Sequence, residues 1–426
     1  MKKVLAMILA AAMVLALAAC GGSSAPAPTA APAATQAAAP AEAPSADDPQ
    51  ITLKLSFSTN EQDPRAIASV QFKEEVESKT NGSVKVEIYP SGQLGGDADL
   101  INSIALDSGT VDVIITDASN FATYEPKMGI SALPFLFSGF DDAWEFMDGE
   151  IEAAAEEGLL AQNMRVLAHY DNGFRCVTNS KGPVETPADM AGMLIRTPEN
   201  PVIMATMSAM GANPQPLAFS ELYQALQQKT YDAQENPIPV IYNNNLYEVQ
   251  SYLSVTNHIY SGMCFTIAES TWNKMSASQQ EIVAAAAKAS ADYDRQMNRQ
   301  QTDDLVSKLE EAGMKINYPD LAPFAEATAS VLTDNAATYG DLLTQLQTWL
   351  ASKYSQRIRK LRMGRRVQPS ALFPYHRSER SNSLYEKSAG ISGHCQHRCG
   401  GGSLRRHDGN SAGKRDPAFY PRYWRL

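Results

Sequence analysis

Short alternating runs and longer helical runs follow one another along most of the chain. Apolar and polar residues alternate over 51–57, and this period of two predicts a strand. Pro64 opens a helical stretch that ends near Ser78, and a second alternating run covers 84–88. A strand that leads into a helix and then into another strand is typical of an α/β protein with a largely parallel sheet.

The same two periods predict further elements downstream. Helices are expected at 98–106, 201–210 and 221–228, and strands at 111–116, 166–170 and 193–196. Ser220 is the expected N-cap of the helix at 221–228, because its hydroxyl can accept from the first free backbone N–H groups.

A long helix is expected near the end of this alternation. Ser276 and Gln279 form a capping box, and Gly313 is the expected stop. An apolar row at helical spacing follows the capping box: Ile282, Ala286, Ala289, Tyr293 and Met297. Unbroken, this helix would be about 50 Å long at 1.5 Å per residue, enough to brace two lobes. A break near Asn298–Thr302 would instead give two helices.

The N-terminus has the pattern of an export signal. Lys2 and Lys3 precede an apolar run from Val4 to Ala19, which indicates a secretory signal peptide. The sequence Leu17-Ala18-Ala19-Cys20-Gly21 resembles a bacterial lipobox, which implies cleavage after residue 19 and lipidation of the Cys20 thiol. Residues 20–49 consist mainly of Ala, Pro, Gly, Ser and Thr and are interpreted as a disordered tether from the membrane to the folded body.

Composition separates a folded body from a different tail. The 426 residues are 44% hydrophobic and 19% charged, which is ordinary for a globular protein. Residues 357–426 contain 16 Lys and Arg against 4 Asp and Glu, although the whole chain carries a formal net charge of −11. We interpret this basic tail as out-of-frame or disordered sequence, and we expect no nucleic-acid partner for an exported lipoprotein. His394, Cys395, His397 and Cys399 match no zinc-site spacing.

The body carries no recognisable catalytic or metal-binding motif. It has no GxSxG, HExxH, P-loop or GxGxxG sequence, so we expect no enzyme activity, cofactor or metal. Its two histidines, His169 and His258, are interpreted as structural. One disulfide bond, between Cys176 and Cys264, is possible.

Arginine is scarce before the tail, and two arginines follow predicted strands. Arg175 comes after the strand expected to end near Tyr170, and Arg196 ends the strand at 193–196. Ligands of open α/β sheets bind beyond the carboxyl ends of strands, and a guanidinium matches a carboxylate bidentately. Arg196 is therefore a candidate carboxylate clamp, with an ion pair to Glu199 as the alternative.

Several ordered blocks resemble one family of binding proteins. The blocks are Tyr89–Gly95, Leu133–Phe135, Ile195–Pro201, Gly211–Pro214, Pro216–Tyr223 and Asp232–Pro237. Together they resemble the DctP-type substrate-binding protein of tripartite ATP-independent periplasmic (TRAP) transporters over about residues 50–354.

The resemblance implies a fold and a set of ligand contacts. It implies a two-lobed, periplasmic-binding-protein-like (Venus-flytrap) α/β fold, with lobe one at 51–173 plus 262–301 and lobe two at 174–261 plus 302–354. The ligand-binding residues that it implies are Arg196, Arg175, Asn236, Phe219, Asp97 and Asp117. The family often has glycine where this chain has Lys229, Thr230 and Tyr231.

The function that the resemblance implies is capture of a small organic anion outside the cytoplasm. The protein would deliver this anion to the membrane permease of a TRAP transporter. A ligand sensor that signals to a membrane receptor is the alternative. A C4-dicarboxylate, a sugar acid or another carboxylate all fit an arginine clamp, so the ligand stays open at this point.

Overall fold

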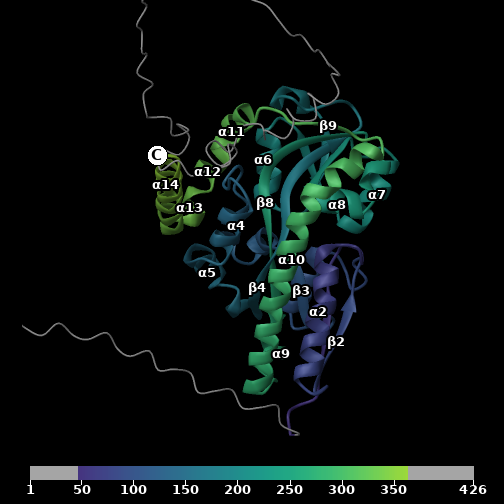
Figure 1. The fold of residues 1–426 in the computed structure, drawn as a ribbon, viewed down its shortest axis with the longest axis vertical. Coiled ribbons are helices and arrows are strands. Elements are labelled where there is room, and N and C mark those ends of the chain that lie inside the picture. The colour runs from purple at the N-terminus through teal and green to yellow at the C-terminus, as the bar shows by residue number, and fades with distance from the viewer. Residues whose placement is uncertain (1–46, 363–426) are drawn as a thin grey trace, which may run out of the picture. The chain divides into compact units, whose positions relative to one another are not determined.

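One mixed sheet organises the part of the chain that the structure describes. The computed structural model describes residues 47–362. Nine strands form a sheet in the order β2-β1-β3-β8-β4-β7-β5-β6, with β9 beside β8 (Figure 1). The strands are β1 (Ile51–Ser56), β2 (Val84–Tyr89), β3 (Val113–Asp117), β4 (Met164–Asn179), β5 (Leu194–Thr197), β6 (Asn213–Pro216), β7 (Ala233–Pro237), β8 (Tyr252–Ala268) and β9 (Lys315–Asn317). The predicted signal peptide, Cys20, most of the tether and residues 363–426 of the tail lie outside the described residues.

Helices connect and flank these strands. The α-helices are α2 (Pro64–Lys79), α3 (Asp97–Ala105), α4 (Phe140–Met147), α5 (Glu150–Glu156), α6 (Pro201–Ala209), α7 (Phe219–Gln227), α8 (Ile238–Asn243), α9 (Glu269–Trp272), α10 (Ala277–Glu311), α11 (Ala322–Ala327), α12 (Ala329–Asp334), α13 (Ala336–Tyr339) and α14 (Asp341–Arg362). The 3₁₀ helices are η1 (Ala118–Thr123), η2 (Pro126–Ala132), η3 (Leu160–Gln162), η4 (Pro187–Met190) and η5 (Leu246–Glu248). No helix among these is both long enough and apolar enough to cross a bilayer.

The α/β prediction is confirmed, but the largely parallel sheet needs correction. Strand β1 pairs in parallel with β2 and β3, and β5 pairs in parallel with β6 and β7. The two longest strands, β4 and β8, run antiparallel to each other, and they pair antiparallel with β7 and β3 respectively. These two strands join both groups of parallel strands into one sheet.

Both faces of the sheet are covered by helices. On β1, β3 and β8, side chains that point to one face pack with α2 and the first half of α10, as in the cluster of Leu55, Phe72, Phe265 and Val283. The opposite face packs against α3 to α6 and the C-terminal helices. Leu305 and Leu309, near the end of α10, pack instead with α7 and α8. Helix α10 therefore runs along both halves of the sheet (Figure 1).

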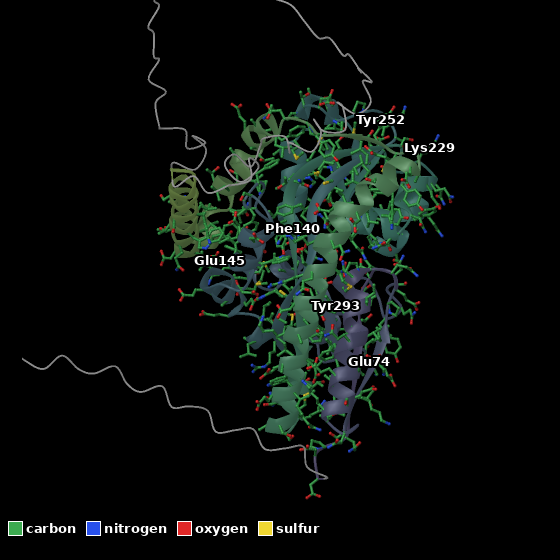
Figure 2. All side chains as sticks on the ribbon, viewed as in Figure 1. Glu74, Phe140, Glu145, Lys229, Tyr252 and Tyr293 are labelled. Carbon is green, nitrogen blue, oxygen red and sulfur yellow. The ribbon has the colours of Figure 1, made fainter. Side chains whose placement is uncertain are left out.

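The long helix is confirmed as one unbroken element, but its buried row differs from the predicted one. The capping box of Ser276 and Gln279 is formed, and the helix has 35 residues before the positive-φ Gly313. Its buried side includes Val283, Ala287 and Ala291. Tyr293, assigned to the apolar row, is 42% exposed and projects from α10 (Figure 2).

Three local predictions are wrong at element ends. Ala218, rather than Ser220, is the N-cap of α7, since the helix begins at Phe219. Strand β4 does not end near Tyr170 but continues past register shifts at Asp171/Gly173 and Arg175/Val177. Helix α14 extends to Arg362, into the first residues of the tail at 357–426 that was interpreted as out-of-frame or disordered.

Cys176 and Cys264 are both buried and both free. They lie on β4 and β8 and are not opposite each other, because Cys264 pairs with His169. The structure therefore contains no disulfide between them.

Candidate functional site

A polar pocket lies where several strands end, with an empty volume of about 430 Å³, part of it open to solvent. All six ligand-binding residues predicted from the sequence line it. They are Asp97, Asp117, Arg175, Arg196, Phe219 and Asn236. The structure thus brings together side chains from β3, β4, β5, β7 and two helix starts.

Arg196 is a buried guanidinium with unused hydrogen-bonding capacity. It is 3% exposed, and its Nε and Nη2 donate to the Leu217 carbonyl at 2.8 and 2.6 Å. Its Nη1 donates to no other described residue, and no described carboxylate lies within ion-pair distance of the guanidinium. Glu199, the alternative partner, does not pair with it. Burial lowers the pKa of Arg196 to about 10, with Glu235 opposing this effect and Arg175 adding to it.

Arg196 differs in this respect from the other five arginines that precede residue 357. Each of those five forms an ion pair with a carboxylate: Arg65 with Asp63, Arg165 with Glu269, Arg175 with Glu235, Arg295 with Asp148 and Arg299 with Asp141. A charge taken out of water is costly unless it is paired. Arg196 therefore presents an uncompensated positive charge to the pocket.

Arg175 is held by Glu235 from the neighbouring strand β7. Its Nε and Nη2 donate to the two carboxylate oxygens of Glu235 at 2.5 and 2.7 Å. Burial alone would raise the pKa of Glu235, but the charge and hydrogen bonds of Arg175, with a contribution from His258, lower it to about 2. Arg175 lies within β4 and not after the end of a strand, as was predicted. Its guanidinium forms part of the pocket wall, and Glu235 already neutralises its charge.

Two carboxylates face the arginines across the pocket. Asp97 is the first residue of α3 and accepts a hydrogen bond from the Ser58 hydroxyl at 2.7 Å. Asp117 ends β3, caps η1 by accepting from the Ser119 backbone N–H at 2.9 Å, and also accepts from the Ser261 hydroxyl. These side chains offer hydrogen-bond acceptors to a ligand.

Asn236 and Phe219 complete the predicted set. The Asn236 amide donates to Gln234 Oε1 at 2.6 Å, and its oxygen accepts from Arg175 Nη2 at 3.3 Å. The Phe219 ring lies 5.8 Å from the Arg196 guanidinium carbon, in cation–π contact. The apolar ring of Phe219 therefore covers one side of the Arg196 guanidinium.

Sequence reasoning missed Arg65 and Asn172, which also line the pocket. Arg65 Nη2 donates to Asn172 Oδ1 at 2.6 Å, and Asn172 in turn donates to the Ser261 hydroxyl at 3.0 Å. A signal was present for Arg65, because it is another of the scarce arginines and opens the helix after β1.

A wider groove adjoins the pocket and shares five lining residues with it: Asp97, Asn120, Arg196, Pro198 and Phe219. Its other lining residues come from the start of α3 with Gly96, the end of η1 with Tyr124, Glu199 and the segment 216–218. Arg196 and Phe219 thus lie where the pocket and the groove meet.

The chain is similar to known binding proteins over most of its described length. Residues 55–341 match the family DctP, bacterial extracellular solute-binding protein, family 7. The chain is 32% identical over 284 residues to the 2,3-diketo-L-gulonate-binding periplasmic protein YiaO of Escherichia coli (strain K12), which covers 66% of this chain and 86% of that protein.

Solved structures show the same likeness. A TRAP periplasmic solute-binding protein of Roseobacter denitrificans with bound L-galactonate is 34% identical, with a TM-score of 0.65 over 69% of this chain and 99% of that chain. One of Sulfurospirillum deleyianum with bound succinate is 30% identical, with a TM-score of 0.67 over 70% and 99% of the two chains.

The fold, the family match and these relatives agree with the resemblance that the sequence blocks indicated. The chain belongs to the DctP family of bacterial extracellular solute-binding proteins, family 7, and is a solute-binding protein of the TRAP type.

Proposed function

We propose that this chain captures a sugar acid, a monocarboxylate that carries several hydroxyl groups, in the pocket beside Arg196. The observation that carries the proposal is the buried Arg196 guanidinium, which lacks a carboxylate partner among the described residues. A ligand carboxylate would supply the missing counter-charge and accept from Nη1. Such charge-assisted bonds are shorter and stronger than neutral ones.

The charges around the pocket favour one ligand carboxylate over two. Asp63 neutralises Arg65, and Glu235 neutralises Arg175, so only Arg196 is left without a paired carboxylate. A second ligand carboxylate would find no free cation and would approach Asp97 or Asp117. Like charges brought together in a desolvated site repel, which disfavours a dicarboxylate.

Hydroxyl groups on the ligand suit the remaining wall. Asp97 and Asp117 accept hydrogen bonds, and the amides of Asn120, Asn172 and Asn236 can both donate and accept. Sugar acids or their derivatives are the ligands named for the Escherichia coli and Roseobacter denitrificans relatives.

We also propose that the ligand is held between two lobes, 51–173 plus 262–301 and 174–261 plus 302–354. Two hydrogen bonds cross between these two groups of ranges. Asn60 Nδ2 donates to the Asn243 carbonyl at 2.7 Å, and Asn200 Nδ2 donates to Ser119 Oγ at 2.5 Å. A ligand that touches both lobes favours the closed state over the open one.

Delivery to a membrane permease follows from the TRAP type of the protein. Two of its relatives are named as a periplasmic binding protein and a TRAP periplasmic solute-binding protein, and we propose that the ligand leaves this chain chemically unchanged. We further propose that a lipid on Cys20 tethers the body to the outer side of a membrane, as the lipobox-like sequence suggests.

A calorimetric comparison of ligands on the full chain tests this proposal. We expect L-galactonate or a related sugar acid to bind at least tenfold more tightly than succinate, with no chemical change detectable by NMR after incubation. Tighter binding of succinate would contradict the single-carboxylate argument. Release of an altered ligand would contradict the binding-protein function.

A further inference from the structure

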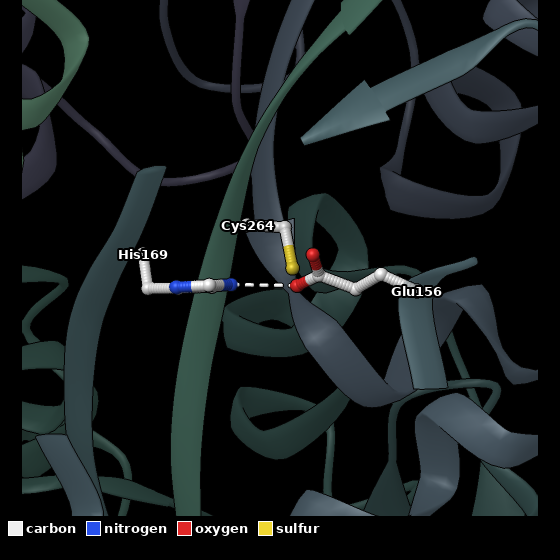
Figure 3. A group of neighbouring side chains, drawn as sticks. All are labelled: Glu156, His169 and Cys264. Atoms are coloured by element: carbon white, nitrogen blue, oxygen red, sulfur yellow. Dashed lines mark hydrogen bonds and ion pairs between the residues drawn. The ribbon is translucent and has the colours of Figure 1, made fainter. Parts of the chain in front are cut away.

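Apart from the residues that line the ligand pocket, a second group of side chains with metal-binding atoms lies on β4, β8 and α5. His169 on β4 and Cys264 on β8 are directly opposite each other in the antiparallel register. Glu156, the last residue of α5, reaches the same point, and its Oε1 lies 2.6 Å from His169 Nε2. Figure 3 shows the Cys264 sulfur beside this carboxylate. One ligand atom from each of the three side chains lies within 4.8 Å of the other two.

A fourth side chain at this place is buried without a partner. Glu152 precedes Glu156 by four residues on α5, so the two carboxylates share one face of the helix. Glu152 is 0% exposed, and neither of its carboxylate oxygens has a hydrogen-bond partner among the described residues. Burial and then the Glu156 charge raise the pKa of Glu152, His169 opposes them, and the net value is about 8. Glu152 is therefore a buried group with unused oxygen atoms, on the face of α5 that also carries Glu156.

The histidine is also oriented as metal-binding histidines are. Its Nδ1 lies 3.3 Å from Asp148 Oδ1, which leaves Nε2 directed at Glu156 and Cys264. Asp148 is itself fixed by Arg295, which donates to both of its carboxylate oxygens at 2.7 and 2.8 Å. A carboxylate on the far nitrogen is the usual outer support of a metal-binding imidazole.

We propose that Glu156, His169 and Cys264, with Glu152 as the fourth group, form a binding site for one zinc-class divalent metal ion. Zinc takes four ligands from thiolate, imidazole and carboxylate groups at about 2.0–2.3 Å, and this set of donors suits it. The thiolate selects against magnesium and calcium, which prefer oxygen ligands. Binding replaces the hydrogen bond between Glu156 and His169, and it displaces to solvent the thiol proton of Cys264, the Nε2 proton of His169 and the carboxyl proton of Glu152.

The position of the site gives the ion a structural role. Cys264 pairs with Thr116 on β3, and Thr116 and the following Asp117 line the ligand pocket. An ion that joins α5 to β4 and β8 would hold the strand that carries Asp117. Sequence analysis missed this site because its residues are far apart in the chain and follow no short metal motif.

Cobalt titration of the full chain under reducing conditions tests the site, because Co²⁺ occupies zinc sites and reports its ligands by absorption. We expect one equivalent of Co²⁺ to produce a thiolate charge-transfer band and the strong visible bands of tetrahedral cobalt. Zn²⁺ should abolish these bands by competition, and it should raise Tm in a concentration-dependent way. Absence of the bands at saturating Co²⁺ would overturn the proposal.

Variants locate the ion within the chain. Cys264→Ser should remove the charge-transfer band, and Glu156→Gln, which preserves a hydrogen bond to His169, should weaken Co²⁺ binding at least tenfold. Cys176→Ser is the matched control, since this buried thiol lies on β4 outside the cluster. A chain with both Cys395→Ser and Cys399→Ser tests whether Co²⁺ binds instead to the cysteines of the tail. If the bands survive Cys264→Ser, or disappear with the tail cysteines, the proposal is wrong.

Discussion

Arg175 and Glu235 form a bidentate ion pair between β4 and β7, with both partners buried. The pair lies in the wall of the ligand pocket, where Arg175 and Arg196 both contribute side chains. Because Glu235 neutralises only the first of these arginines, the two have different roles. Arg175 lines the pocket and donates to Asn236, while Arg196 has no paired carboxylate among the described residues.

Replacing Arg196 should abolish ligand binding without unfolding the protein. Arg196→Met removes the charge that we assign to the ligand carboxylate, and loss of one partner of a buried pair costs about 3–5 kcal/mol. We therefore expect L-galactonate affinity, measured by calorimetry, to fall by about 10²–10⁴-fold.

The same variant should leave Tm nearly unchanged. Removal of an uncompensated buried charge offsets the loss of the donors to the Leu217 carbonyl, which is worth about 1 kcal/mol. Arg299→Met is the matched control, because Arg299 forms an exposed ion pair with Asp141 away from the pocket. Equal losses of affinity in both variants would refute a specific role for Arg196.

The Arg175–Glu235 pair should show strong coupling in a double-mutant cycle. Arg175→Met and Glu235→Gln each leave one buried group without its partner, so each should lower the free energy of unfolding by about 3–5 kcal/mol. The double variant should be less destabilised than the sum of the two. Urea denaturation measures all four corners of the cycle, and additive effects would show that the pair contributes no mutual stabilisation.

Glu235 should also contribute to acid sensitivity. Its pKa is about 2 in the folded protein, against a usual value of 4.5, so the unfolded chain binds this proton first as pH falls. The stabilisation is complete above about pH 4.5 and is lost between about pH 4.5 and 2, up to roughly 3 kcal/mol. Glu235→Gln should therefore have a flatter dependence of unfolding free energy on pH in this window. Parallel curves for the two proteins would contradict the assignment.

The sequence predicted the local elements better than it predicted how they join. Periodicity located β1, β2 and α2 closely, because each has one buried face and a clear boundary residue. Periodicity predicted the end of β4 too early. The strand continues through bulges near Gly173, and these bulges interrupt the alternation of apolar and polar residues. The antiparallel pairing of β4 with β8 depends on residues some ninety positions apart, which no local period encodes.

For the site, the sequence identified residues but not their partners. The family-like blocks and the scarcity of arginine indicated Arg175 and Arg196, and both line the pocket. That Glu235 neutralises one and not the other depends on strand order, with β7 between β4 and β5. Arg65 and Asn172 were missed because their contact joins the start of α2 to the middle of β4.

The two pocket carboxylates should control the choice between one-carboxylate and two-carboxylate ligands. Asp97→Asn and Asp117→Asn each remove a negative charge from the wall while preserving the shape of the side chain. We expect succinate affinity to rise and L-galactonate affinity to fall, which should change their ratio by about tenfold or more through roughly 1–2 kcal/mol. Calorimetry with both ligands measures this ratio. An unchanged ratio in both variants would remove the electrostatic basis for sugar-acid selectivity.

The hydrogen bond between Asn60 and Asn243 should slow ligand release. Asn60 follows β1, Asn243 ends α8, and their 2.7 Å bond crosses between the two proposed lobes. Asn60→Ala removes about 1 kcal/mol from the closed state only, so the dissociation rate constant should rise about fivefold while Tm without ligand changes little. Stopped-flow displacement of bound L-galactonate measures the rate. Asn273→Ala is the matched control, because Asn273 bonds to Glu269 within the same proposed lobe. An unchanged release rate in Asn60→Ala, or an equal increase in Asn273→Ala, would argue against closure between these two ranges of the chain.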